Sequence, residues 1–261
     1  MATPAPARSG FRIAGPEVST TIYSHPPLVE SWLGVDFAAE TPLTDADSEA
    51  LRAALGPEWS GSWKETSPGT VWQGKQLTNV MGDRALRLIP QGFSFGWLGH
   101  GGEYYPRYES VRDGFVTVLD AVRALANRQD KALHPLRWSV RYVNRIPRGT
   151  VWSATGEWSF FSMWQPVPLE AIGVNPTSFR AQWELPLEAE RGNLSIEFRH
   201  DPADSLDDTD FVWINLTASG PIDDVETSLF DGLDFGREVI VRSFNELVSA
   251  DAKAFWGVRT K

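Results

Sequence analysis

Residues 136–146 alternate large apolar and basic side chains, and Pro147 follows them directly. One parity carries the apolar side chains, namely Trp138, Val140, Tyr142 and Ile146. The other carries Ser139 and Val143 together with three arginines, Arg137, Arg141 and Arg145. A period of two is typical of a strand with one buried face. Because a strand rises about 3.3 Å per residue, successive arginines would stand about 13 Å apart. The segment predicts a half-buried strand whose arginines face either water or a ligand.

Apolar periodicity predicts the remaining elements. Alternation predicts strands at residues 27–37, 71–78, 85–90, 93–98, 179–187, 194–198 and 211–217. Helical spacing predicts two long helices, at 110–128 with Ser110 as N-cap and at 234–248 with Asp234 as N-cap. A short helix is expected at 45–55, stopped by Gly56-Pro57. This order predicts an α+β fold with a curved, mainly antiparallel sheet and two long helices packed on one face.

Two halves of the chain repeat the same order of elements. Residues 1–24 are expected to be a disordered or extended lead, and residues 25–261 a single α+β domain with pseudo-halves 25–130 and 131–261. Each half would follow the order β-α-β-β-β-α, with an irregular stretch in place of the short helix in the second. Duplication is one explanation, and chance recurrence of a common meander-plus-helix unit is the other.

The charge and residue composition exclude several classes of function. The formal net charge of −10 argues against a protein that lives on nucleic acid. The charge is uneven, with 14 acidic and 2 basic residues in 182–234, but 5 acidic and 11 basic residues in 84–148. The absence of cysteine excludes disulfides, thiolate metal ligands and cysteine nucleophiles. No apolar run reaches the roughly 20 residues of a membrane span, and residues 1–10 contain no secretory apolar region, so we expect a cytoplasmic protein without membrane contact.

Catalytic and metal-binding motifs are weak. Among four histidines, His100 in a glycine-rich loop, with Glu103 nearby, is the best catalytic candidate. The acidic tract 201–210 lacks the glycine turn and distal glutamate of a calcium loop, so we predict a solvent-exposed loop there. No phosphate-binding glycine motif follows a strand. We therefore predict neither a metal nor a cofactor.

The basic strand provides the sharpest candidate for binding. Glu30 and Trp32 lie on the polar parity of the first predicted strand, as the three arginines do on theirs. If these two strands pair at the sheet centre, Glu30 would face Arg141 or Arg145 as a charge-assisted pair. In that case the charges of Glu30 and the arginines would only stabilise the sheet. The alternative is that the arginines bind a ligand. The candidate binding residues are Glu30, Trp32, Arg137, Arg141 and Arg145. Most of the twelve tryptophans are expected in the core, with Trp59, Trp63, Trp152 and Trp158 in less regular stretches.

Two segments carry a resemblance to a known family. Residues 27–31 read Pro-Leu-Val-Glu-Ser, and residues 141–146 read Arg-Tyr-Val-Asn-Arg-Ile. They resemble the PLVEA-like first strand and the RYINRI-like central strand of a sporadically distributed, uncharacterised bacterial family. Ser31 departs from the usual alanine, and residues 211–217 lack the paired aspartates typical there. The family has no established activity, so the resemblance implies architecture, and its patchy distribution suggests mobile-element or defence-linked genes.

These observations favour a non-catalytic binding or adaptor subunit that presents a curved sheet to a protein partner or to a second copy of itself. Two alternatives stay open. One is an enzyme of unknown chemistry with a site around His100 and Glu103. The other is a nucleic-acid or nucleotide binder that uses the row Arg137, Arg141 and Arg145.

Overall fold

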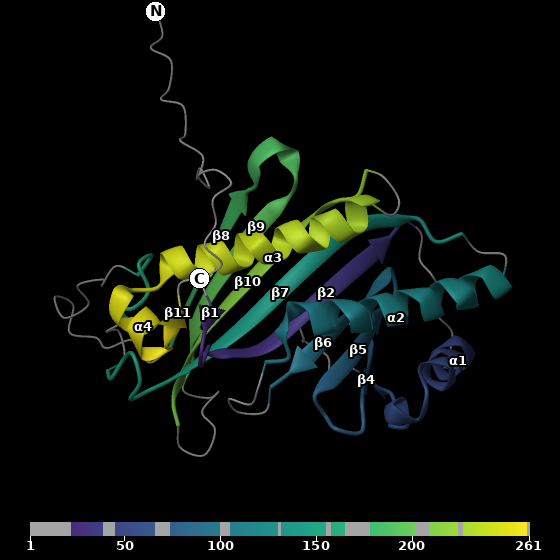
Figure 1. Ribbon diagram of the computed structural model, residues 1–261, viewed down its shortest axis with the longest axis horizontal. Helices are drawn as coiled ribbons and strands as arrows, with labels where there is room; N and C mark the ends of the chain where they lie inside the picture. The colour runs from purple at the N-terminus through teal and green to yellow at the C-terminus, as the bar shows by residue number, and fades with distance from the viewer. Residues whose placement is uncertain are drawn as a thin grey trace, which may run out of the picture.

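A nine-stranded antiparallel sheet runs through the whole fold (Figure 1). The computed structural model describes residues 22–38, 45–65, 74–99, 105–129, 132–154, 158–164, 178–201, 209–223 and 227–259. In spatial order the strands are β3 (Lys64–Glu65), β4 (Lys75–Thr78), β5 (Arg84–Ile89), β6 (Gly92–Leu98), β2 (Leu28–Phe37), β7 (Pro135–Pro147), β10 (Phe211–Pro221), β9 (Asn193–His200) and β8 (Phe179–Pro186). The predicted α+β class with an antiparallel sheet is confirmed.

The two strands with the clearest alternation pair at the centre of this sheet. β2 and β7 are antiparallel neighbours, with Leu33 opposite Val140 and Val35 opposite Trp138. All four of these side chains are almost fully buried. The strand predicted at residues 71–78 is observed from Lys75 onward, and residues 71–73 lie outside the described part of the chain.

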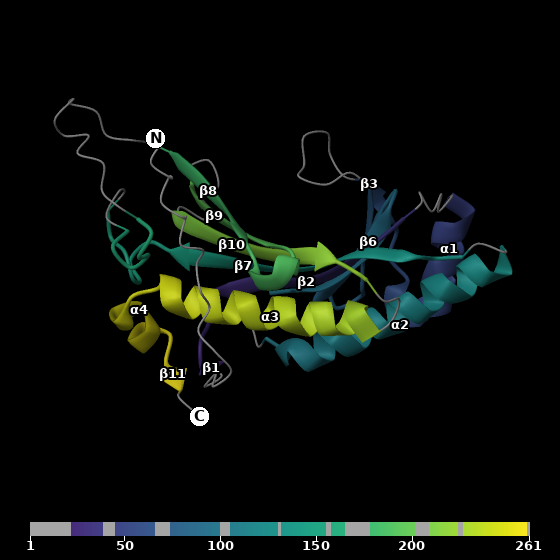
Figure 2. The same cartoon turned by 90° about the horizontal axis from the view of Figure 1, so that it is seen from above.

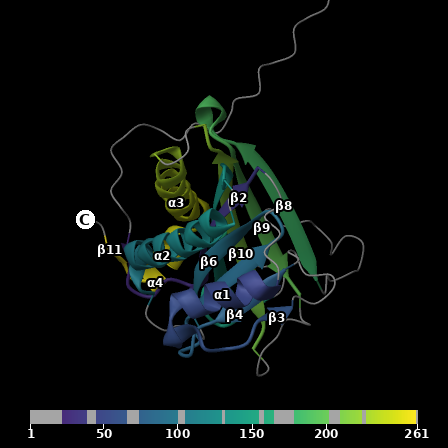
Figure 3. The same cartoon turned by 90° about the vertical axis from the view of Figure 1, so that its right-hand side faces the viewer.

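Two long helices cover the buried side chains of the central strands. α2 (Arg107–Arg128) packs against β6 and β2, and α3 (Thr227–Leu247) packs against β7 and β10. Figure 2 shows both helices beneath the sheet, and β8 and β3 at its two edges bending away from them. α1 (Asp45–Leu55), which matches its predicted bounds, packs on α2. Figure 3 shows the curvature end-on, with the helices on one side and β8 on the other.

Glycines allow α3 to approach the sheet closely. A Cβ atom on Gly232 would lie 2.3 Å from Cδ1 of Trp138, and one on Gly236 would lie 2.6 Å from Cζ3 of the same indole. Real side chains do not tolerate such distances. The indole of Trp138, which is 2 % exposed, therefore fills the space that these glycines leave.

The N-caps predicted for the long helices are wrong. α2 begins at Arg107 and α3 at Thr227, so Ser110 and Asp234 both lie inside helices. Their side chains take part in tertiary contacts instead. Ser110 Oγ accepts a hydrogen bond from Arg84 Nη2 at 3.3 Å, and Asp234 Oδ1 accepts one from the hydroxyl of Tyr108 at 2.6 Å.

The chain ends of the described part lie together. β1 (Ile22–Tyr23) pairs with β11 (Val258–Arg259), so these two residues of the predicted lead are part of a small sheet; residues 1–21 lie outside the described part. Tyr23 packs edge-on against Phe244 and Trp256. Before β11, α4 (Ala250–Phe255) is capped by Ser249, whose Oγ accepts a 3.2 Å hydrogen bond from the Ala252 amide.

Three of the four tryptophans from the irregular stretches are buried in the core, and the fourth, Trp63, is partly buried against it. Trp59, Trp152 and Trp158 are 5 %, 4 % and 0 % exposed. Two short 3-10 turns, η1 (Pro57–Trp59) and η3 (Glu188–Glu190), complete the described elements. In the described ranges no helix has the length and apolar character that crossing a membrane requires. The predicted strands and long helix occur in the expected order in each half, but the first half also contains β3, which was not predicted. The origin of the two halves by duplication stays a prediction.

Candidate functional site

The motif in β7 sends its side chains to two different environments. Tyr142 and Asn144 point to the helix side of the sheet, where both line a cavity beside α3. Arg141 and Arg145 lie on the opposite face, because neighbouring residues of a strand point to opposite sides. We call this opposite face, which carries the side chains of Trp32, Arg141 and their cross-strand neighbours, the open face.

Glu30, Trp32 and Arg87 form a compact group on the open face. The indole Nε1 of Trp32 donates a hydrogen bond to Glu30 Oε2 at 2.7 Å. The guanidinium of Arg87 lies 3.5 Å from the centroid of the same indole, and its Nη2 is 3.9 Å from Glu30 Oε2. Burial lowers the pKa of Arg87 to about 10; Glu30 opposes this shift and Arg141 adds to it. Arg87 is thus still a cation at neutral pH, held by a carboxylate and an aromatic face.

The predicted pair between Glu30 and Arg141 or Arg145 is wrong. Glu30 lies directly opposite Val143, and its ion pair is with Arg87 of β5. The intervening strand β6 offers Gly96 at this point. A Cβ there would lie 2.5 Å from the Trp32 ring. Since Gly96 has no side chain, the indole can lie across β6 and Arg87 can reach Glu30 over it.

This arrangement gives a first prediction about stability. We expect Glu30→Ala and Arg87→Ala to be coupled by about 0.5–1 kcal/mol in a double-mutant cycle, because the pair is only partly buried. The cycles of Glu30→Ala with Arg141→Ala and with Arg145→Ala should be additive. Urea unfolding of each single and double variant measures these energies. Coupling to Arg141 larger than coupling to Arg87 would contradict the observed pairing.

Arg141 is the central cation of the open face. It lies opposite Trp32 on β2 and Thr217 on β10. Among the described residues it makes no hydrogen bond and no ion pair. The other two arginines of the row also make no hydrogen bond or ion pair among the described residues, but each has a neighbour of another kind. Arg145 lies 4.8 Å from the ring centroid of Phe211, while Arg137 opposes the rise that burial causes in the pKa of Asp36.

Cations outnumber carboxylates on the open face. Toward the β8 edge, Glu197 accepts a hydrogen bond from Asn215 at 3.0 Å and forms an ion pair with Arg180, whose Nη2 lies 2.7 Å from Glu197 Oε1. Cross-strand pairing within β2 and β5–β10 places six arginines and four carboxylates on this side: Arg87, Arg137, Arg141, Arg145, Arg180 and Arg199, with Glu30, Asp36, Glu184 and Glu197. A protein with a net charge of −10 thus presents a locally basic surface.

The predicted catalytic candidates His100 and Glu103 lie outside the described residues. Within the described ranges no group of three or more acidic or histidine side chains could hold a metal ion. Of the acidic tract, residues 202–208 also lie outside. At its ends His200 Nε2 and Asp210 Oδ1 are 2.9 Å apart, and His200 is 1 % exposed against the ring of Trp152. This pair joins β9 to the start of β10.

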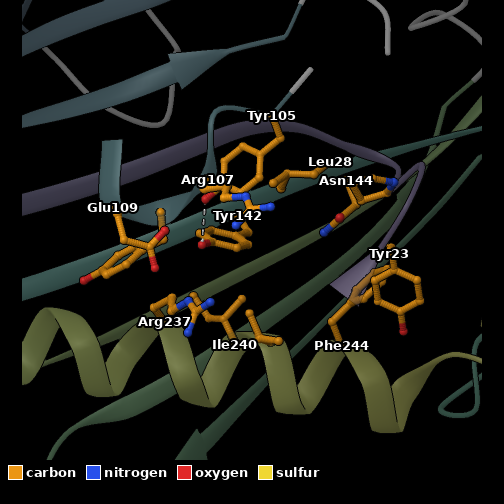
Figure 4. Close-up of a pocket in the computed structure, with 13 residues that line it drawn as sticks. Tyr23, Leu28, Tyr105, Arg107, Glu109, Tyr142, Asn144, Arg237, Ile240 and Phe244 are labelled. Atoms are coloured by element: carbon orange, nitrogen blue, oxygen red, sulfur yellow. Dashed lines mark hydrogen bonds between the residues drawn. The ribbon is translucent and has the colours of Figure 1, made fainter. Parts of the chain in front are cut away.

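The structure also contains a cavity that the sequence did not reveal. It has a volume of about 370 Å³ and lies between the start of α2, α3 and the helix side of β2 and β7 (Figure 4). Its walls combine five apolar side chains, one of them Pro26, with tyrosines, arginines, an amide and the carboxylate of Glu109. The lining includes Leu28, Ile240, Val241, Phe244, Tyr105, Tyr108, Tyr142, Asn144, Arg107 and Arg237. The two sequence segments that carry the family resemblance both contribute, through Leu28 and through Tyr142 and Asn144.

No protein-family model and no curated protein significantly matches this chain. The candidate sites are therefore defined by the chain's own geometry.

Proposed function

We propose that this protein is a non-catalytic binding subunit whose open face receives an acidic segment of a protein partner. The observation that carries the proposal is Arg141, a cation at the centre of a curved sheet for which the described residues supply no counter-ion. Its neighbour Arg87 is already held by Glu30 and Trp32. A carboxylate from a partner would form a charge-assisted hydrogen-bonded pair with Arg141.

The shape and charge of the open face support a protein ligand over a small substrate. Both long helices, α2 and α3, lie on the other side of the sheet, so neither of them covers the open face. The six arginines and four carboxylates form a mixed polar surface, and such surfaces confer specificity and steer association. Resemblance in the Arg141–Ile146 motif also leads us to propose membership in the sporadically distributed bacterial family.

Nucleic acid is the second candidate, favoured by the row Arg137, Arg141 and Arg145. The net charge of −10 opposes it, because a phosphate backbone would meet repulsion over most of the molecule. We therefore expect no binding of single-stranded RNA or DNA at physiological salt in a gel-shift experiment.

Photo-crosslinking in the native host tests the proposal. We would place p-benzoylphenylalanine at Thr217, which lies opposite Arg141 on the open face, and as a control at the exposed Thr117 on α2. We expect an adduct from position 217 only, mapped to an acidic segment. Arg141→Glu should abolish the adduct, while the same charge reversal at the exposed Arg128 should preserve it.

The purified partner then gives the quantitative measurement. Arg141→Ala should weaken its binding by tenfold or more, since losing a charge-assisted hydrogen bond costs about 1.5–3 kcal/mol. Two results would overturn the proposal: equal adducts from positions 117 and 217, or a partner whose affinity is indifferent to Arg141. Tight, salt-sensitive gel shifts would favour the nucleic-acid alternative instead.

A further inference from the structure

The cavity between α2, α3 and the sheet has the size and lining of a small-molecule site. Its volume of about 370 Å³ falls within the roughly 300–1,000 Å³ that is usual for ligand pockets. Ile240 and Phe244 rise from α3 on one side, and Leu28 faces them from β2 (Figure 4). These side chains form an apolar wall for the body of a ligand.

The opposite end of the cavity is polar. Arg237 of α3 projects toward Tyr142 of β7 in Figure 4. Among the described residues Arg237 makes no hydrogen bond or ion pair, its Nε is buried without a partner, and its guanidinium lies 5.4 Å from the ring centroid of Tyr108. A buried donor without an acceptor destabilises the unliganded protein, and an anion in the cavity would satisfy it.

Phenol groups extend this polar end. The hydroxyls of Tyr105 and Tyr142 are 3.0 Å apart and share one hydrogen bond. Burial raises the pKa of both tyrosines, so both are neutral at pH 7 and one proton of the pair is free to reach a ligand. They add hydrogen-bond donors without adding negative charge.

The start of α2 contributes a second cation and a strained backbone. Arg107, Tyr108 and Glu109 of the first turn line the cavity. Arg107 has a φ of 70°, an unfavourable conformation for a residue with a side chain. Such strain is common at ligand sites, where it fixes the direction of a side chain. The lining therefore carries two arginines against one carboxylate.

We propose that this cavity binds a small organic anion, with an apolar or aromatic body against Ile240 and Phe244 and a carboxylate-like head at Arg237 and the Tyr105–Tyr142 pair. The site lies on the helix side of the sheet and is independent of the partner surface on the open face.

Two fluorescent probes with the same ring system test this inference. 8-Anilinonaphthalene-1-sulfonate carries an anionic head, and N-phenyl-1-naphthylamine lacks it. We expect the full-length protein to bind the sulfonate with one-to-one stoichiometry in a fluorescence titration. Arg237→Met should weaken binding of the sulfonate by about tenfold or more, because a charged hydrogen bond is lost. It should leave the affinity for the neutral probe nearly unchanged.

A second variant tests the location by filling the space. Val241 lines the cavity and is only partly buried, so Val241→Trp should block both probes while circular dichroism confirms the fold. Arg128→Met, at the exposed end of α2, removes the same charge outside the cavity and should change neither affinity. Sulfonate binding that survives both Arg237→Met and Val241→Trp in folded protein would overturn the inference, as would equal losses for the two probes in Arg237→Met. Partner binding through Arg141 should persist in Val241→Trp, so failure of one site is distinguishable from failure of the other.

Discussion

Replacing Trp138 with alanine should reduce the free energy of unfolding by about 3–5 kcal/mol, the range for truncating a large buried aromatic side chain. The indole is 2 % exposed and lies in the contact between β7 and α3. It packs edge-on against Phe235 at 6.2 Å between centroids and occupies the space over Gly232 and Gly236. Removing the indole would leave a cavity between β7 and α3. This cavity cannot close unless the helix moves. Equilibrium urea unfolding measures the loss.

A matched change on α3 tests the same contact from the other side. Alanine favours a helix over glycine by about 1 kcal/mol, yet we expect Gly232→Ala to destabilise by about 1–3 kcal/mol, because its Cβ would overlap the indole. In the Trp138→Ala background the same change should become neutral or stabilising. Met81→Ala, at a residue 78 % exposed, should stay within about 0.5 kcal/mol as a control. Stabilisation by Gly232→Ala in the wild-type background would mean that the indole does not fill this space.

The sequence predicted the central strands well because their pattern is a direct consequence of burial. A residue of β7 either points to the helices or away from them, so Trp138 and Val140 had to be apolar while Arg141 could be charged. α1 was also predicted within its observed bounds, because Gly56-Pro57 ends it sharply. Local patterns of this kind need no knowledge of the partner element.

The helix starts were mispredicted because capping residues have other uses. Ser110 and Asp234 have the side chains that cap helices, but both contact residues distant in sequence. A carboxylate that accepts a hydrogen bond from Tyr108 on another helix looks the same in sequence as one that accepts from its own backbone. Only the tertiary arrangement distinguishes the two.

The partner of Glu30 could not be predicted from parity alone. Parity placed Glu30 and the arginines on one face, which agrees with the structure. The choice of Arg87 depends on β6 lying between two strands and on Gly96 leaving space there. The cavity was missed for a similar reason. Its lining comes from β1, β2, α2, β7 and α3, and the sequence signal was limited to an arginine, Arg237, on the largely apolar stripe of α3.

Raising the pH above 10 should destabilise this protein steeply. Burial raises the pKa of Tyr23 to about 12 and raises the pKa of Tyr105, Tyr108 and Tyr142. An unfolded tyrosine loses its proton near pH 10, whereas these folded tyrosines keep theirs. Above pH 10 the folded state therefore binds more protons than the unfolded state, and stability falls as pH rises. The tyrosine contribution is fully present below pH 10 and is lost through the folded pKa values.

One group acts in the opposite direction. Burial lowers the pKa of Arg87 to about 10, so between about pH 10 and its usual value the folded state releases this proton first. That change stabilises the folded protein as pH rises, and it offsets the loss of stability that one tyrosine causes. Because four tyrosines have raised pKa values and one arginine has a lowered pKa, the net slope of stability against pH stays negative.

Tyr142→Phe isolates one of these contributions, because Tyr142 is 8 % exposed and burial raises its pKa well above the ordinary value. Near pH 8 the variant should be less stable by about 1 kcal/mol, from the lost hydrogen bond to Tyr105. Above pH 10 its stability should fall less steeply than that of the wild type, by about 1.4 kcal/mol per pH unit, so the two curves converge and then cross. Urea unfolding at pH 8, 10 and 11 measures this. Tyr23→Phe, at a more exposed residue, should change the slope less. Parallel curves for wild type and Tyr142→Phe would show that Tyr142 ionises freely in the folded protein, and that the polar end of the cavity is more hydrated than its hydrogen-bonded phenols indicate.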